Sequence, residues 1–159
     1  MNERQERMNR RWYKQWLSCG FTGKMEDRMN EYGWFRDRLD PATITKITVV
    51  KAKEADIEVE YTQLPNGKWV TGRWLTTKVD CMYGSVSGAS IWDAQYDTKG
   101  EAVTAELDSI LDAIKRNNPK ALTEKVKAAI AKYRNQFANA SVFDAFFGAG
   151  AKFEQTELF

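Results

Sequence analysis

A change of hydrophobic period in the middle of the chain constrains its fold more than any other feature. Apolar and polar residues alternate on both sides of the sequence Leu64-Pro65-Asn66-Gly67. Alternation with period two is typical of half-buried strands, and an Asn-Gly pair between two such runs is typical of a hairpin turn. We therefore predict a four-stranded antiparallel meander: two strands within 43–61, a third over 68–79 and a fourth over 89–95, after a loop at 84–88.

Helical periodicity before and after these strands makes the predicted fold class α+β. Two N-terminal helices are expected over 2–18 and 24–38, because apolar residues recur there at helical spacing. Thr98 and Glu101 have the spacing of a capping box, which begins a helix that runs through Arg116. A longer helix follows over 120–138. The meander is thus flanked by two N-terminal and two C-terminal helices.

The length of 159 residues fits a single domain, which we place at 1–147. Residues 148–159 begin with a Gly- and Ala-rich stretch and are expected to form a flexible C-terminal tail. No apolar run approaches the roughly 18 residues of a membrane span, so we expect no membrane association. Two cysteines without CxxC spacing predict free thiols in the reducing cytoplasm.

The chain contains no histidine, which excludes a Ser-His-Asp triad, an HExxH zinc site and most transition-metal centres. It also lacks the phosphate-binding GxxxxGK(S/T) and GxGxxG patterns and the GxSxG pattern of serine hydrolases. We therefore expect no enzymatic activity, no cofactor, no metal site and no small-molecule substrate.

Glu58 and Glu60 offer the one catalytic alternative. Residues at i and i+2 of a strand lie on the same face, and metal-dependent nucleases use paired carboxylates. The same pattern next to Ile57 and Val59 is also that of an ordinary solvent-exposed strand face. We prefer the second interpretation.

Two basic helix faces are candidate nucleic-acid contacts. In the first helix, four cations recur at i, i+3, i+7 and i+10: Arg4, Arg7, Arg11 and Lys14. In the last helix, Lys125 and Lys132 belong to a second basic face. Such side chains supply the sequence-independent part of nucleic-acid affinity, although a solvated surface has the same composition.

The predicted sheet is also rich in aromatic residues, and these allow two interpretations. They are Trp69, Trp74, Tyr83, Trp92 and Tyr96. Aromatic residues on strands are typical of core packing and cross-strand pairs. An exposed platform on which bases stack is the alternative.

The sequence ends with Gln155-Thr156-Glu157-Leu158-Phe159, which places two large apolar side chains at the terminus. Burying each fully is worth about 1.5–3 kcal/mol, so both require a pocket. This pentapeptide resembles the short motif, close to Gln-Leu-(Ser or Asp)-Leu-Phe, with which bacterial proteins bind the DNA polymerase sliding clamp. Gln155, Leu158 and Phe159 match its strongest positions and Glu157 keeps its acidic character, whereas Thr156 departs from the preferred leucine.

The resemblance implies that Leu158 and Phe159 fill a hydrophobic pocket on the clamp and that Gln155 hydrogen-bonds at a second subsite. The alternative is that both apolar residues fold back onto the core of this protein. We expect a non-enzymatic accessory or inhibitor protein of a phage or plasmid, with the sliding clamp as partner and DNA as a second one. The other hypothesis is a counter-defence or nucleic-acid-binding protein that acts through its basic helix faces and its sheet.

Overall fold

A computed structural model describes residues 1–147 of the chain, and the side chains through Asn139. The helices are α1 (Glu3–Ser18), α2 (Lys99–Asn117) and α3 (Glu124–Phe147). The strands are β1 (Thr45–Lys51), β2 (Ala55–Gln63), β3 (Trp69–Thr77) and β4 (Tyr83–Ser87). Short 3-10 turns are η1 (Met25–Arg28), η2 (Pro41–Thr43) and η3 (Pro119–Ala121).

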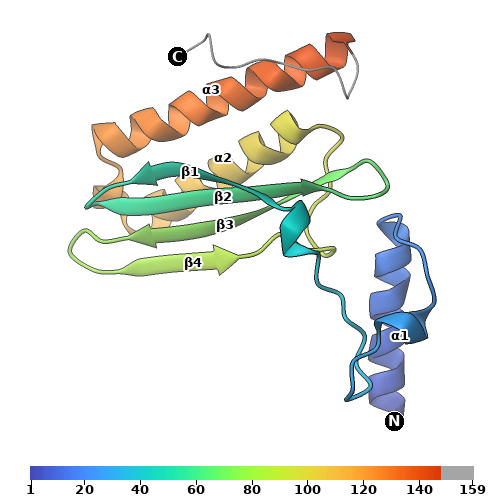
Figure 1. The fold of residues 1–159 in the computed structure, drawn as a ribbon. Coiled ribbons are helices and arrows are strands. Elements are labelled where there is room, and N and C mark those ends of the chain that lie inside the picture. Colours follow the sequence, from blue (N-terminus) through green and yellow to red (C-terminus); the bar gives the residue numbers. More distant parts are fainter. Residues whose placement is uncertain (148–159) are drawn as a thin grey trace.

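The strands form one antiparallel sheet in the order β1-β2-β3-β4, as the alternating pattern predicts. Helices α2 and α3 pack together and cover the same face of this sheet, α2 over β2 and β3 and α3 along β1 (Figure 1). The opposite face is not covered by a helix of the described chain, and we call it the open sheet face. The α+β class and the four-stranded antiparallel sheet are therefore confirmed.

The covered face of the sheet forms the main hydrophobic core. Its fully buried members include Ile57, Val59 and Leu75 from the sheet and Leu107 and Ile114 from α2. Helix α2 begins as predicted, because the Thr98 side chain accepts a hydrogen bond from the Glu101 amide at 3.1 Å. These residues recur at strand and helix spacing, so the core follows directly from the periodicity.

A second core lies at one end of the sheet, where α1 packs beside the β2–β3 turn (Figure 1). Trp16 of α1 and Cys19 at its end are buried there together with Leu64, Val70 and Ile91. The predicted turn joins the two parts, because its Asn66 amide donates to the Cys19 carbonyl at the end of α1 (3.0 Å). Such a bond satisfies one of the terminal carbonyls that every helix leaves free.

The predicted helix over 24–38 is wrong, so one helix rather than two precedes the sheet. Only η1 is helical there, and Met29 pairs with Phe35 as an isolated antiparallel bridge. The Asn30 side chain accepts hydrogen bonds from the amides of Tyr32 and Trp34, both at 2.9 Å. Gly33 adopts a φ of 75°, a left-handed conformation that breaks a helix. Turn chemistry thus overrides the spacing of the apolar residues.

The predicted fourth strand over 89–95 is also wrong. Strand β4 occupies 83–87, and Gly84 within it and Gly88 just after it favour a loop when the sequence is considered alone. It pairs with β3 from Thr77↔Tyr83 to Arg73↔Ser87, and residues 89–95 form the connection to α2. The last helix also differs: it begins at Glu124, after η3, and extends to Phe147.

Because residue 72 of β3 is a glycine, the chain can cross over β3 where β4 ends. A β-carbon at this position would lie 2.4 Å from the Ala89 nitrogen and 2.5 Å from the Ser87 oxygen. Residues 87–89 therefore pass through the space that a side chain at position 72 would occupy. At Gly84, on β4, the nearest atom to an added β-carbon would be 3.7 Å away.

We predict that Gly72→Ala lowers the free energy of unfolding by about 1–3 kcal/mol, because the loop backbone must move to accept the methyl group. Urea denaturation measures this change. Gly84→Ala is the matched control on the neighbouring strand, and it should leave stability unchanged or raise it by up to about 1 kcal/mol. Equal effects of both substitutions would contradict the proposed close packing.

The Asn9 side chain fixes the loop at 30–35 on α1. It is fully buried, and its amide nitrogen donates to the Gly33 carbonyl at 2.7 Å. Its amide oxygen accepts from the Phe35 backbone amide at 2.9 Å. One side chain thus satisfies the buried Phe35 amide and shares the part-buried Gly33 carbonyl with Gln5, so its loss is costly.

We expect Asn9→Ala to destabilise the fold by about 1–3 kcal/mol, since it leaves the buried Phe35 amide without a partner and the Gly33 carbonyl with the Gln5 side chain alone. Gln5→Ala is the control, because Gln5 donates to the exposed Tyr32 carbonyl and to the Gly33 carbonyl, which keeps its bond from Asn9 in this variant. Its loss should cost less than about 1 kcal/mol, because water can replace the side chain. Thermal denaturation of both variants tests this, and a neutral Asn9→Ala would refute it.

Candidate functional site

The sequence points to four places in the molecule, and those within the described residues lie on different elements. The tail residues Gln155, Glu157, Leu158 and Phe159 lie outside the described residues. Glu58 and Glu60 lie on the open sheet face, and the two basic faces lie on α1 and α3.

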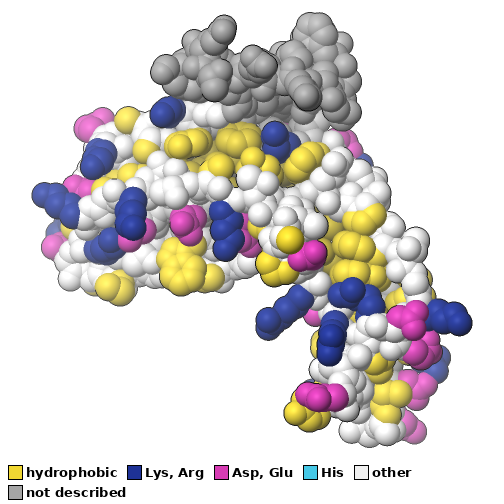
Figure 2. All heavy atoms as spheres, in the orientation of Figure 1, with side chains coloured by type: hydrophobic (Ala, Val, Ile, Leu, Met, Phe, Trp, Pro, Cys, Tyr) yellow, Lys and Arg dark blue, Asp and Glu magenta, His cyan; other side chains and the backbone are white. Residues whose placement is uncertain are grey.

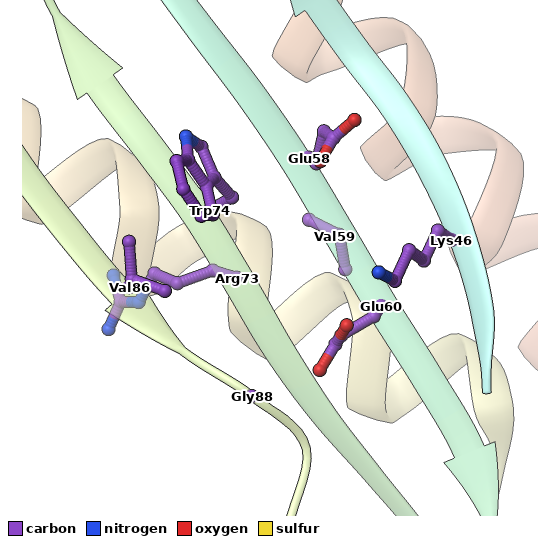
Figure 3. Close-up of a pocket in the computed structure, with 8 residues that line it drawn as sticks. All are labelled: Lys46, Glu58, Val59, Glu60, Arg73, Trp74, Val86 and Gly88. Atoms are coloured by element: carbon purple, nitrogen blue, oxygen red, sulfur yellow. The ribbon is translucent and has the colours of Figure 1, made fainter. Parts of the chain in front are cut away.

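Glu58 and Glu60 point to the same side of β2, as their spacing predicts (Figure 3). Glu58 is exposed opposite Trp74 of β3, and Lys46 extends from β1 toward β2. Glu60 is half-buried, and its carboxylate accepts a hydrogen bond from the Ala89 amide at 2.6 Å. Among the side chains that the structure describes, through Asn139, no three of His, Cys, Asp or Glu gather in a way that could hold a metal ion.

Asp93 supports the same loop from its other end. Its carboxylate accepts from the Ser90 amide at 2.6 Å, next to the bond from Ala89 to Glu60. Burial raises the pKa of the Asp93 carboxyl, hydrogen bonds from Ser90 oppose this, and the charge of Glu60 raises it further. Glu60 and Asp93 thus hold the segment that crosses the sheet, which is a structural role that sequence spacing could not show.

The aromatic residues of the sheet do not form one platform. Trp69 packs against Tyr61 with ring centroids 6.2 Å apart, and its backbone pairs with Tyr96. Trp92 lies in the connection after β4, and its indole nitrogen donates to the Asp37 side chain at 3.2 Å. Trp74, 52% exposed, is the large aromatic side chain that remains open on this face. Figure 2 shows charges of both signs mixed around the apolar groups there.

Three cations of the predicted last helix, one on η3 and two on α3, pair with carboxylates, two of which come from other elements. Lys120 pairs with Asp80 at 2.8 Å, and Arg134 pairs with Asp108 of α2 at 2.8 Å. Lys127 pairs with Glu124 at 2.9 Å. Lys125 and Lys132 are exposed between these pairs, and the Lys132 ammonium lies 5.6 Å from the Tyr133 ring. The sequence showed only Glu124 as a nearby acid, because Asp80 and Asp108 come from elsewhere in the chain.

The basic face of α1 is different. Arg4, Arg7, Arg11 and Lys14 are all exposed or half-exposed, and none of them forms a salt bridge with another residue of the described chain. The acid of this helix that does pair, Glu6, contacts Arg10. We call these four residues the α1 cationic face. Its positive charge is available to an external anion.

A pocket next to this face contains two tryptophans. It is lined by Asn2, Arg4, Met8, Trp12 and Trp34 and has a volume of about 400 Å³. Trp12 comes from α1 and Trp34 from the loop that Asn9 fixes, and their ring centroids are 5.8 Å apart. We call it the tryptophan pocket. It could not be predicted from the sequence, because a helix over 24–38 gives no reason to place Trp34 against α1.

No known protein family, curated protein or solved structure matches this chain significantly. Among residues 1–147, no helix combines the length and apolar composition that crossing a bilayer requires.

Asp93→Asn tests the role of the half-buried Asp93 carboxyl. A raised folded-state pKa means that the fold loses stability from this group as the pH rises through that value. Asparagine keeps an acceptor for the Ser90 amide but cannot ionise. The free energy of unfolding of the variant, relative to the unsubstituted protein, should therefore increase from about pH 4 to pH 7.

Urea denaturation across this pH range measures the difference. Asp112→Asn, at an exposed position of α2, is the matched control. The prediction is wrong if both variants follow the same pH dependence.

Proposed function

We propose that the chain is a non-enzymatic accessory or inhibitor protein that binds the bacterial DNA polymerase sliding clamp through its last five residues. The match of Gln155, Leu158 and Phe159 to the clamp-binding motif carries this proposal. Leu158 and Phe159 are the anchors, and Glu157 keeps the acidic position of the motif. The setting that fits such a protein is a phage or plasmid in the cytoplasm of a bacterium.

The folded part of the chain supports the proposal as a carrier for the peptide. Among the residues whose side chains the structure describes, the buried members of its two hydrophobic cores lie between Trp16 and Phe137. A short peptide that enters a preformed groove binds weakly by itself. A second contact made by the folded part would raise the apparent affinity, because the two are joined by the tail.

Occupation of the clamp pocket could have either of two opposite effects on replication. The chain could compete with the host polymerase for the clamp, or it could bring its folded part to replicating DNA. The second outcome needs a DNA contact, for which the α1 cationic face is the strongest candidate. Its four cations have no carboxylate partner among the described residues.

The second candidate function is that of a nucleic-acid-binding or counter-defence protein in which the tail is incidental. The α1 cationic face favours it, because arginines without a carboxylate partner in the described chain attract a polyanion. Deleting residues 155–159 separates the two functions. Clamp binding should disappear, whereas binding by the folded part should remain.

Phe159→Ala tests clamp binding directly. Removing an interface anchor costs about 2 kcal/mol or more, so the affinity for a purified bacterial sliding clamp should fall at least about 30-fold. Isothermal titration calorimetry provides the measurement. Phe153→Ala removes the same side chain from the tail outside the motif, and it should leave the affinity unchanged.

Two outcomes would overturn the proposal. One is failure of the unsubstituted chain to bind the clamp, and the other is equal binding by both phenylalanine variants. A synthetic peptide of residues 155–159 should compete with the full chain for the clamp, since both occupy the same pocket.

A further inference from the structure

The tryptophan pocket and the α1 cationic face lie side by side on one surface of α1. We propose that together they bind single-stranded nucleic acid, with a base stacked in the pocket against Trp12 and Trp34 and the phosphates along the cations. This inference does not depend on clamp binding. It assigns a ligand to a part of the molecule that the clamp motif does not involve.

The pocket has the properties of a stacking site. Its volume of about 400 Å³ falls in the range of small-ligand pockets. The Trp12 and Trp34 rings are inclined by 39°, and Trp34 remains 36% exposed beside Met8 and the partly exposed Trp12. Two large rings that are only partly covered by the protein leave π surface for a flat partner. Stacking of this kind accepts any base.

The pocket is held in place before any ligand binds. The Trp34 amide donates to the Asn30 side chain at 2.9 Å, and its carbonyl accepts from the Asn30 amide at 2.8 Å. On either side of Trp34, the Asn9 side chain bonds to Gly33 and Phe35. The loop therefore presents Trp34 in one position, which lowers the entropic cost of binding.

The cations continue from the pocket along the helix. Arg4 lines the pocket itself, and Arg7, Arg11 and Lys14 follow at helical spacing on the adjoining face. From Arg4 to Lys14 the face extends about 15 Å along the helix axis, at about 1.5 Å per residue. Glu3 and Glu6 belong to the same helix, but Glu6 pairs with Arg10. A negatively charged backbone thus meets several cations in a row.

Trp92 extends the aromatic surface beyond the pocket. It is 42% exposed, and the Arg11 guanidinium lies 5.3 Å from its ring centroid. Arg11 therefore connects the α1 cationic face to a third tryptophan, from the β4–α2 connection. A strand that follows the cations would have the Trp92 ring within reach as well.

The combination favours a single strand over other polyanions. A duplex offers phosphates but keeps its bases stacked within the helix, so it cannot use the tryptophans. An acidic protein segment would use the cations, but it has no general need for exposed aromatic rings. An unpaired nucleotide strand supplies both a flat ring and regularly spaced negative charges.

Fluorescence anisotropy tests the proposal in the full-length chain, with labelled oligothymidine and oligouridine of about 20 nucleotides each as probes. We expect Trp34→Ala to weaken binding by about 5- to 150-fold, the range for the loss of one stacked base. Trp74→Ala is the matched control, because Trp74 is an exposed tryptophan on the open sheet face. It should leave the affinity unchanged.

A pair of charge reversals tests the second half of the site. Arg7→Glu should weaken binding and reduce its salt dependence. The slope of log K against log salt should become shallower by about 0.7 for each phosphate that the variant no longer neutralises. Lys125→Glu makes the same type of charge change on α3 and should have little effect. Circular dichroism of each variant confirms that the fold is intact.

Three results would overturn the proposal. One is the absence of measurable binding to either oligonucleotide. Another is that a duplex binds as tightly as the single strands and that Trp34→Ala does not weaken its binding. The third is a poly-glutamate peptide that binds more tightly than the oligonucleotides, which would assign the surface to an acidic protein partner. Deleting residues 155–159 should leave oligonucleotide affinity intact, so failure of clamp binding and failure of this site can be told apart.

Discussion

Asn9 gives α1 its place in the molecule, because its buried amide bonds to both the Gly33 carbonyl and the Phe35 amide. A hydrophobic contact alone would let the loop slide along the helix, whereas two directional bonds fix its position. This places Trp34 against Trp12 and Phe35 into the second core. The surface features of α1 therefore depend on a polar interaction in the interior.

The second core in turn depends on the β2–β3 hairpin. Leu64 and Val70, on the two sides of the turn, are buried against α1 residues, and Asn66 bonds to the end of that helix. Gly20 permits this approach, because a β-carbon there would lie 2.5 Å from the Asn66 nitrogen. A sheet covered on one face by α2 and α3 thus gains a separate lobe at its end without sharing its main core.

This division separates the charged surfaces of the molecule. On η3 and α3, acids from the β3–β4 connection and from α2 pair with Lys120 and Arg134, so part of the charge is balanced within the fold. On α1 the cationic face lies away from those acids. The difference explains why two faces that look alike in sequence differ in their availability to a ligand.

Local signals in the sequence determined much of the fold. The alternation around Leu64-Pro65-Asn66-Gly67, the capping box at Thr98 and the apolar stripe of α2 all act over a few residues, and each is present in the structure. The motif at Gln155–Phe159 is also a property of sequence alone. What only the tertiary structure decided are features that join distant residues: the Asn9 bonds that replace a helix at 24–38, the passage of residues 87–89 over Gly72, and the meeting of Trp12 with Trp34. Periodicity cannot show these, because it reports which side of an element is apolar and not which other element lies against it.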